Sequence, residues 1–280
     1  MRRYILFCFV VLAMVPFGLE DSARAQPSDA IIEDCLETTV REPSQRLQMD
    51  PFFEKYTDAQ GIPVVASGDV PDRGLLVARD VILHMLKKTP SIQQHMIDEG
   101  YKLGVMADTD STMDIPWYRD LEKPDGVDEE MTAAEYWNQR ARGLGGDEVT
   151  CAAENILGYP GTKYFGENIL VHEFSHSIHQ AIREVKPEVA EEIEAAYQDA
   201  MANGLWEDHY ASTNAGEYWA EGTQFWFNSN YEYEEGDQRV LNSAELMRYD
   251  PKLYKLLERV YPSDHHIPMD VFYKHEARVQ

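Results

Sequence analysis

The sequence has few cysteines, few basic residues and only one long hydrophobic run. Three cysteines occur in 280 residues, and none has the spacing of a metal site. Lys and Arg number 25 against 50 Asp and Glu, which gives a net charge of -25. Nucleic acids and anionic membranes would repel so acidic a protein, so we expect neither as a partner. The G-x-S-x-G, P-loop and dinucleotide-binding motifs are also absent, so those enzyme classes have no sequence signal.

The single long hydrophobic run stands at the start of the chain. Two arginines precede an apolar segment over residues 4–17, and an A-x-A cleavage site follows at residues 23–25. This order predicts a signal peptide over residues 1–25 that is cleaved near Ala25. An uncleaved membrane anchor is the alternative, but the run is short for a bilayer span. We expect a secreted or periplasmic protein without stable membrane association after cleavage.

The two cysteines beyond this leader are Cys35 and Cys151. In an oxidising compartment a disulfide between them and two unpaired thiols are equally consistent with the sequence. No repeat or linker interrupts the remaining chain, so we interpret residues 26–280 as one domain. Residues 26–58 are polar with scattered apolar residues, which favours a segment that wraps the domain or serves as a pro-segment.

The N-terminal half is predicted to form a small sheet with helices. Residues 62–67 and 101–106 have the composition of strands. Apolar residues recur at helical spacing over residues 77–86, with Pro90 as the stop. A polar segment follows, in which a short helix is expected at residues 133–141.

The second half is predicted to be mainly helical. Residues 166–185 have the apolar stripe of a helix, and Pro187 opens a second helix at a position that favours proline. Asn214 can cap a third helix over residues 215–228. Because strands precede helices without β-α-β alternation, the pattern predicts an α+β fold.

An H-E-x-x-H motif, His172-Glu173-x-x-His176, lies in the first of these helices. Histidines four residues apart lie one turn apart on the same face and can bind one metal ion. Glu173 can then reach a water on that ion and take its proton. The motif supplies only two of the three protein ligands of a catalytic zinc, and copies of it arise by chance. Core or surface histidines are therefore the alternative interpretation.

A third ligand has to come from further along the chain. His179 follows the motif, but the glycine and histidine offsets of the three-histidine class are missing. The third helix carries Glu217 and Glu221, two carboxylates four residues apart on one face. Burying two acids on a helix rich in aromatic residues is costly unless a cation or a histidine partners them. Either glutamate can ligate zinc, while the other can hydrogen-bond a ligand histidine.

Hydrolysis of an amide at neutral pH needs a nucleophile and a donor for the oxyanion. Zinc lowers the pKa of its bound water to about 7. Glu173 would accept that proton and pass it to the leaving amine. Tyr210, in the loop before the third helix, fits the role of the oxyanion donor, with simple packing as its other interpretation.

The two motifs together resemble those of the anthrax lethal factor-like zinc metallopeptidases. The first is H-E-F-S-H at residues 172–176, and the second is Y-x-x-x-N-x-x-E-Y-W-A-E at residues 210–221. The family pattern usually has an acidic residue between that Asn and the first Glu, where this chain has alanine and glycine, and Gly222 follows the second motif. These departures concern the cleft rather than the ligands. The resemblance extends over residues 166–228.

The resemblance implies a zincin-like fold of the gluzincin type that holds one zinc ion. It assigns three ligands to this sequence, His172, His176 and Glu217. It places the Tyr210 hydroxyl beside the metal-bound oxyanion, and it places Glu221 around the ligands rather than on the metal. We assign Asn214 to that surrounding group as well.

The sequence thus predicts a secreted zinc metalloendopeptidase that acts on a peptide or protein substrate. One alternative is a zinc-stabilised binding or adhesion protein that keeps the same geometry without turnover. Another is a zinc hydrolase of a non-peptide amide, such as a cell-wall crosslink. Substrate specificity and oligomeric state have no signal in the sequence.

Overall fold

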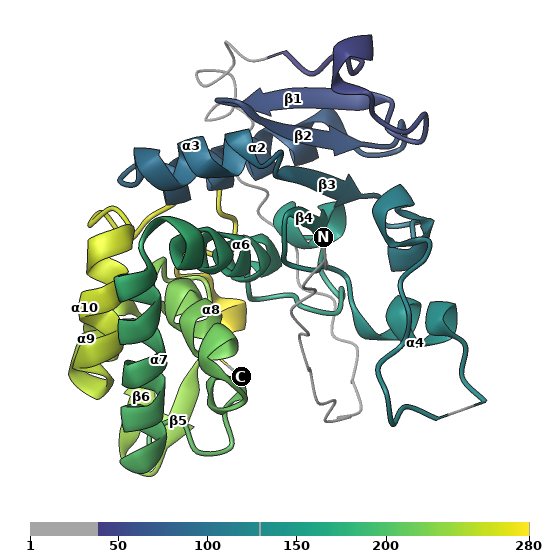
Figure 1. The fold of residues 1–280 in the computed structure, drawn as a ribbon. Helices are drawn as coiled ribbons and strands as arrows, with labels where there is room; N and C mark the ends of the chain where they lie inside the picture. The colour runs from purple at the N-terminus through teal and green to yellow at the C-terminus, as the bar shows by residue number, and fades with distance from the viewer. Residues whose placement is uncertain (1–38, 129, 280) are drawn as a thin grey trace.

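The computed structural model describes residues 39–128 and 130–279 (Figure 1). The predicted signal peptide, Cys35 and residues 26–38 of the predicted wrapping segment lie outside these residues. Cys151 is fully buried in a strand, and both a disulfide with Cys35 and two unpaired thiols stay open. Within the described residues, no helix combines the length and apolarity that crossing a bilayer would require.

A four-stranded mixed sheet forms the framework of the N-terminal half. β1 (Lys55–Ala59) and β2 (Ile62–Ala66) form an antiparallel hairpin. β3 (Lys102–Met106) and β4 (Glu148–Ala152) follow in parallel, so the strand order is β1-β2-β3-β4. The strands predicted from the sequence are β2 and β3. β1 and β4, which are the two edge strands of the sheet, were not predicted.

The predicted absence of β-α-β alternation is wrong, because connections that contain helices join the parallel strands. α2 (Asp72–Leu86) and α3 (Pro90–Asp98) join β2 to β3. Pro90 therefore starts a second helix, at a first-turn position where its missing N–H costs nothing. The link from β3 to β4 is mostly polar loop, which hid this crossover in the sequence, and it contains η2 (Thr112–Asp114), η3 (Pro116–Tyr118) and α4 (Ala133–Arg140).

The second half is mainly helical, as predicted. The short α5 (Ala153–Ile156) follows β4 directly. The main helices of the second half are α6 (Ile169–Val185), α7 (Pro187–Ala202), α8 (Ala215–Trp226), α9 (Ser243–Tyr249) and α10 (Pro251–Val260). A small hairpin of β5 (Tyr233–Glu235) and β6 (Gln238–Val240) separates α8 from α9. Short 3-10 turns complete the chain at η1 (Gln45–Leu47), η4 (Tyr210–Ser212) and η5 (Glu276–Arg278).

Apolar side chains cover both faces of the sheet. One face, with Val64, Leu103 and Val149, belongs to the large core that the helices complete. The other face, with Val65 and Met106, packs under the β3–β4 link in a second, smaller core. In Figure 1, α6 to α10 gather on one side of the sheet and α4 lies on the other.

α6 lies at the centre of the large core. The members of its predicted apolar stripe are all at most 1% exposed, namely Leu170, Val171, Phe174, Ile178, Ala181 and Ile182. The helix contacts β4, α3, α7 and α8. Burial on nearly every side removes the helix from bulk water and fixes the direction of its polar side chains.

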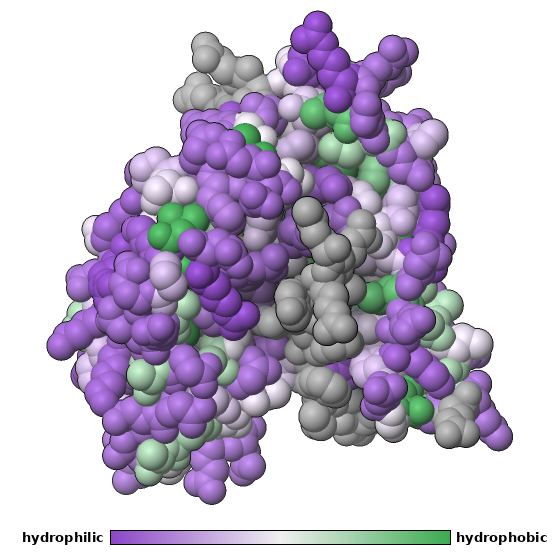
Figure 2. Space-filling view, viewed as in Figure 1, coloured by the Kyte–Doolittle hydropathy of each residue, from purple (hydrophilic) through white to green (hydrophobic). Residues whose placement is uncertain are grey.

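The outer surface agrees with the acidic composition. Figure 2 shows a mostly hydrophilic face on which hydrophobic residues form small, scattered patches. A high net charge of one sign keeps such a surface soluble through mutual repulsion.

Candidate metal centre

The start of α6 is fixed by Asn168. Its Oδ1 accepts a hydrogen bond from the Val171 amide at 3.3 Å, which caps the helix. Its Nδ2 donates to Asp270 Oδ1 at 2.9 Å. The helix therefore begins three residues later than the predicted Gly166, because a capping side chain lies at residue 168. This anchoring sets the rotation of the turn that carries the H-E-x-x-H motif.

The start of α8 is capped in the same way. Asn214 Oδ1 accepts hydrogen bonds from Gly216 N at 2.8 Å and Glu217 N at 3.0 Å. Asn214 thus holds the backbone of Glu217 directly, as the predicted cap. A glutamate in the first turn of a helix is also favoured by the helix dipole.

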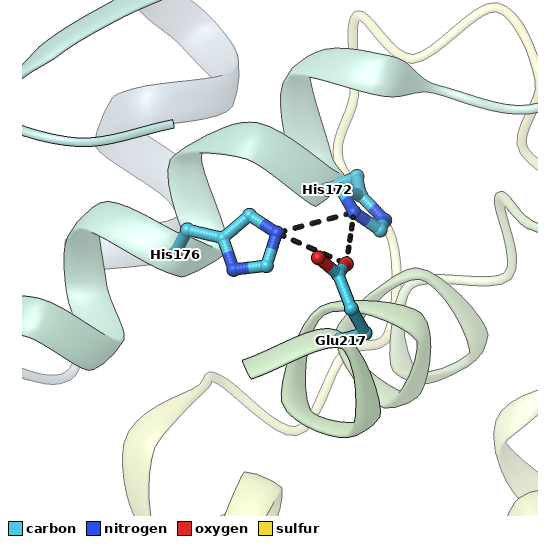
Figure 3. A group of neighbouring side chains, drawn as sticks. All are labelled: His172, His176 and Glu217. Carbon is cyan, nitrogen blue, oxygen red and sulfur yellow. Dashed lines mark hydrogen bonds and ion pairs between the residues drawn. The ribbon is translucent and has the colours of Figure 1, made fainter. Parts of the chain in front are cut away.

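α6 and α8 bring three candidate ligands together (Figure 3). His172 Nε2 lies 3.1 Å from Glu217 Oε2 and 3.2 Å from His176 Nε2. His176 Nε2 lies 3.3 Å from the same glutamate oxygen. Within the described part of the chain, no other set of three His, Cys, Asp or Glu side chains converges in this way.

The donor set fits a zinc ion. Donor atoms bound tetrahedrally to zinc at about 2.0–2.1 Å lie about 3.3–3.4 Å apart, close to the separations found here. The residues are at most 5% exposed, and two imidazoles with one carboxylate are ligands that zinc prefers. Burial alone would raise the pKa of Glu217, but His176 and His172 outweigh it and hold that pKa far below its ordinary value.

The far side of the His172 ring is also engaged. Its Nδ1 lies 3.0 Å from Gln224 Oε1 and 3.4 Å from Glu221 Oε1. Glu221 therefore faces the ring nitrogen opposite to the one that faces Glu217. This geometry favours Glu217 over Glu221 as the ligand, and it puts Glu221 where a partner of a ligand histidine is expected.

Glu221 is itself held by a polar network. Its Oε2 accepts a hydrogen bond from Asn230 Nδ2 at 2.6 Å and lies 3.7 Å from His209 Nε2. Burial would raise the pKa of Glu221, but His172, His209 and Asn230 together lower it. The second acid on α8 thus has the partners that its burial requires.

Glu173 and Tyr210 are the other predicted members of the site. Glu173 lies between the two histidines in sequence and is 4% exposed. The Tyr210 ring stacks beside that of His172, with centroids 6.2 Å apart and planes 26° apart. The structure therefore places the Tyr210 ring beside one ligand and buries Glu173 on the helix that carries two of them. Their chemical roles stay predictions.

His179 lies deeper in the core than the motif histidines. It is 2% exposed, and its ring lies 6.0 Å from that of Trp219. Burial, with the charges of Arg183 and His176, lowers the pKa of His179 to about 3. It is not part of the converging set, in agreement with the missing offsets of the three-histidine class.

A glycine-rich segment before β4, residues 143–146, packs directly on the H-E-x-x-H motif. Leu144 pairs with Thr150 in an antiparallel bridge. A Cβ added to Gly145 would lie 2.7 Å from His176 Cβ and 2.9 Å from Glu173 O. Ser177 Oγ donates to Gly146 O at 2.6 Å. The segment can approach α6 this closely because it lacks side chains at these points.

Sequence reasoning missed Gln224 and Asn230. Gln224 has a weak signal, because it continues the helical face of Glu217 and Glu221 at the i+7 position. Asn230 lies in a loop, where no periodicity marks it. Only its contact with Glu221 reveals its part in the network.

Comparison with known proteins adds little to this picture. No family model and no curated protein matches the sequence. Among solved structures, one that resembles it is that of the Pro-Pro endopeptidase PPEP-2 from Paenibacillus alvei. The match has 15% sequence identity and a TM-score of 0.47, and it covers 71% of this chain and 97% of that one. A likeness at this level carries no functional argument, so the function is argued from the site alone.

Proposed function

We propose that the protein is an exported zinc metallopeptidase that cleaves peptide bonds, with residues 26–280 as a single domain. The observation that carries the proposal is the convergence of the His172, His176 and Glu217 donor atoms at 3.1–3.3 Å in a buried cluster. Two imidazoles and one carboxylate leave one position open in a tetrahedral zinc site, which is the arrangement of catalytic rather than structural zinc.

The residues around the ligands supply the rest of the chemistry. Zinc, when bound, polarises a carbonyl group and lowers the pKa of water to about 7. Glu173, buried beside the ligands on α6, would accept the proton of the attacking water and transfer it to the leaving amine. The Tyr210 hydroxyl would donate a hydrogen bond to the oxygen that gains negative charge in the transition state.

The decisive experiment compares Glu173→Gln with the wild type and with Glu184→Gln. Glu184 lies on the same helix but is exposed. Glu173→Gln is expected to keep zinc and to lower kcat/KM for peptide cleavage by about 10²–10⁴-fold. Glu184→Gln should retain both. Zinc content from metal analysis and cleavage of a diverse peptide library, read by mass spectrometry, provide the measurements.

Two outcomes would contradict the proposal. Wild-type protein with full zinc occupancy that cleaves nothing in the library would favour the zinc-stabilised binding protein. Products from a non-peptide amide alone would favour the other hydrolase. Export has its own test, because N-terminal sequencing of the secreted or periplasmic protein should begin at Gln26.

A further inference from the structure

Gln224 connects the ligand His172 to the start of α6. It lies on α8, is fully buried, and has each end of its amide engaged. Its Oε1 lies 3.0 Å from His172 Nδ1. Its Nε2 donates to the Asn168 carbonyl oxygen at 3.1 Å and to Glu167 Oε2 at 3.3 Å. The side chain therefore spans the gap between the two helices that supply the ligands.

The neighbours of Gln224 determine how its amide is oriented. A backbone carbonyl such as that of Asn168 can only accept a hydrogen bond, so the amide nitrogen has to face it. The amide oxygen then has to face His172 Nδ1. An oxygen acceptor at this position requires the proton of the imidazole to reside on Nδ1. The Asn168 carbonyl, which can only accept a hydrogen bond, therefore determines both the orientation of the Gln224 amide and the position of the proton on His172.

The position of this proton determines which nitrogen of His172 can bind a metal ion. With its proton on Nδ1, neutral His172 presents the lone pair of Nε2 to the point where His176 Nε2 and Glu217 Oε2 converge. Glu221 also approaches Nδ1, but at 3.4 Å, and its other oxygen is held by Asn230 at 2.6 Å. Gln224 is therefore the nearer acceptor for the single Nδ1 proton.

We propose that Gln224 is a positioning residue that sets the ring orientation and tautomer of the ligand His172. The assignment rests on the proposed zinc site but not on peptide cleavage. Hydrogen bonds of this kind orient a metal-binding histidine and raise its basicity, and their loss typically weakens metal binding 10–100-fold. Asn168 caps α6, and its carbonyl oxygen accepts a hydrogen bond from the Gln224 amide. It therefore holds Gln224 in place relative to the helix that carries His172 and His176.

The test measures zinc affinity by competition with a chelator. Gln224→Met keeps the length of the side chain but removes the acceptor, and it is expected to weaken zinc binding about 10–100-fold. Gln224→Glu keeps an oxygen toward Nδ1, and its protonated carboxyl, which can still donate to the Asn168 carbonyl, should restore most of that loss. Thr223→Val is the matched control, because buried Thr223 bonds to Trp219 O and Tyr261 but not to a ligand. It should lower the melting temperature of the metal-free protein and leave zinc affinity within about twofold of wild type.

Several results would overturn the assignment. Wild-type affinity in Gln224→Met, or a loss in Glu221→Gln alone, would make Glu221 the positioning residue. Equal losses in the Met and Glu variants of Gln224 would reveal a packing role. A wild-type protein that takes up no zinc would remove the site and this assignment together. Zinc binding without peptide cleavage would contradict the proposed function and leave the role of Gln224 standing.

Discussion

At the scale of single residues, the histidines of α6 differ in what surrounds them. His172 and His176 face the carboxylate of Glu217, which gives their buried ring nitrogens a polar partner. His179 lies one turn further into the core, where Nδ1 has no hydrogen-bond partner among the described residues. The same residue type on the same helix therefore serves as a candidate ligand at two positions and as a neutral core side chain at a third.

This difference predicts a pH dependence of stability for the metal-free protein. The pKa of His179 is about 3 in the folded state and about 6.5 when unfolded. The unfolded chain takes up a proton below pH 6.5 that the folded chain refuses, so stability falls as the pH drops toward 3. Linkage gives a loss of roughly 2 kcal/mol between pH 7 and pH 5 from this residue.

His179→Leu should remove that contribution, while His266→Gln, at an exposed ring where burial lowers the pKa less, should change the slope less. Urea unfolding at both pH values with a metal chelator present measures it. An unchanged difference between pH 7 and pH 5 in His179→Leu would refute the prediction.

The chemistry of single residues was also easier to predict from the sequence than the elements or the overall fold. The spacing of His172, Glu173 and His176 is a local property of a helix, and the two glutamates of α8 stand out by their charge among aromatic neighbours. Gln224 could not be selected in the same way. A glutamine acquires meaning at this site only through its two partners, Asn168 and His172, which lie 56 and 52 residues away in the chain.

At the scale of elements, α6 is held between α8 and the glycine-rich segment before β4. The contact with Gly145 leaves no space for a side chain next to His176. A methyl group there would meet helix backbone and a Cβ, neither of which can rotate away. The position of His176 relative to Glu217 therefore depends on a loop that carries no ligand.

Gly145→Ala is expected to displace His176, weaken zinc binding at least about tenfold and destabilise the fold by about 1–3 kcal/mol. Gly68→Ala provides the control, because an added Cβ there would meet only the carboxylate of the exposed Glu54 at 3.1–3.3 Å. Chelator competition and denaturant unfolding measure the two effects. Zinc affinity in Gly145→Ala equal to that of Gly68→Ala would contradict the role of this contact.

Element types were predictable where periodicity is strong, and connections were not. The apolar stripe of α6 and the Asn214 cap of α8 follow from local patterns, whereas the Asn168 cap of α6 was not predicted. β4 was missed because both its faces are buried, so its five residues show no alternation. The parallel pairing of β3 with β4 depends on a crossover whose polar loop gives no sign of where the chain returns.

At the scale of the whole molecule, the C-terminal residues support the site from a distance. Buried Arg278 donates to Asn230 O at 2.6 Å and also to Leu241 O. Asn230 in turn donates to Glu221, which faces His172. A continuous chain of contacts thus joins the end of the described chain to the candidate metal ligand.

Arg278→Met should leave one buried and one part-buried carbonyl oxygen without their donor and lower the free energy of unfolding by about 2–4 kcal/mol. It should also weaken zinc binding by loosening Asn230. Arg259→Met is the control, because its ion pair with Glu192 lies at the surface and contributes about 1 kcal/mol or less. Denaturant unfolding of both variants checks the prediction, and equal stability losses would refute it.

The sequence by itself determined the chemistry that is available: the two histidines, the adjacent glutamate and the acidic helix, each set by local spacing. It also determined that the chain has buried helices, because their apolar periodicity is local too. Only the tertiary structure decided which of the two glutamates of α8 joins the histidines, because that choice depends on the rotation of α8 against α6. The same packing decided that Gln224 meets His172 and that Gly145 lies against His176.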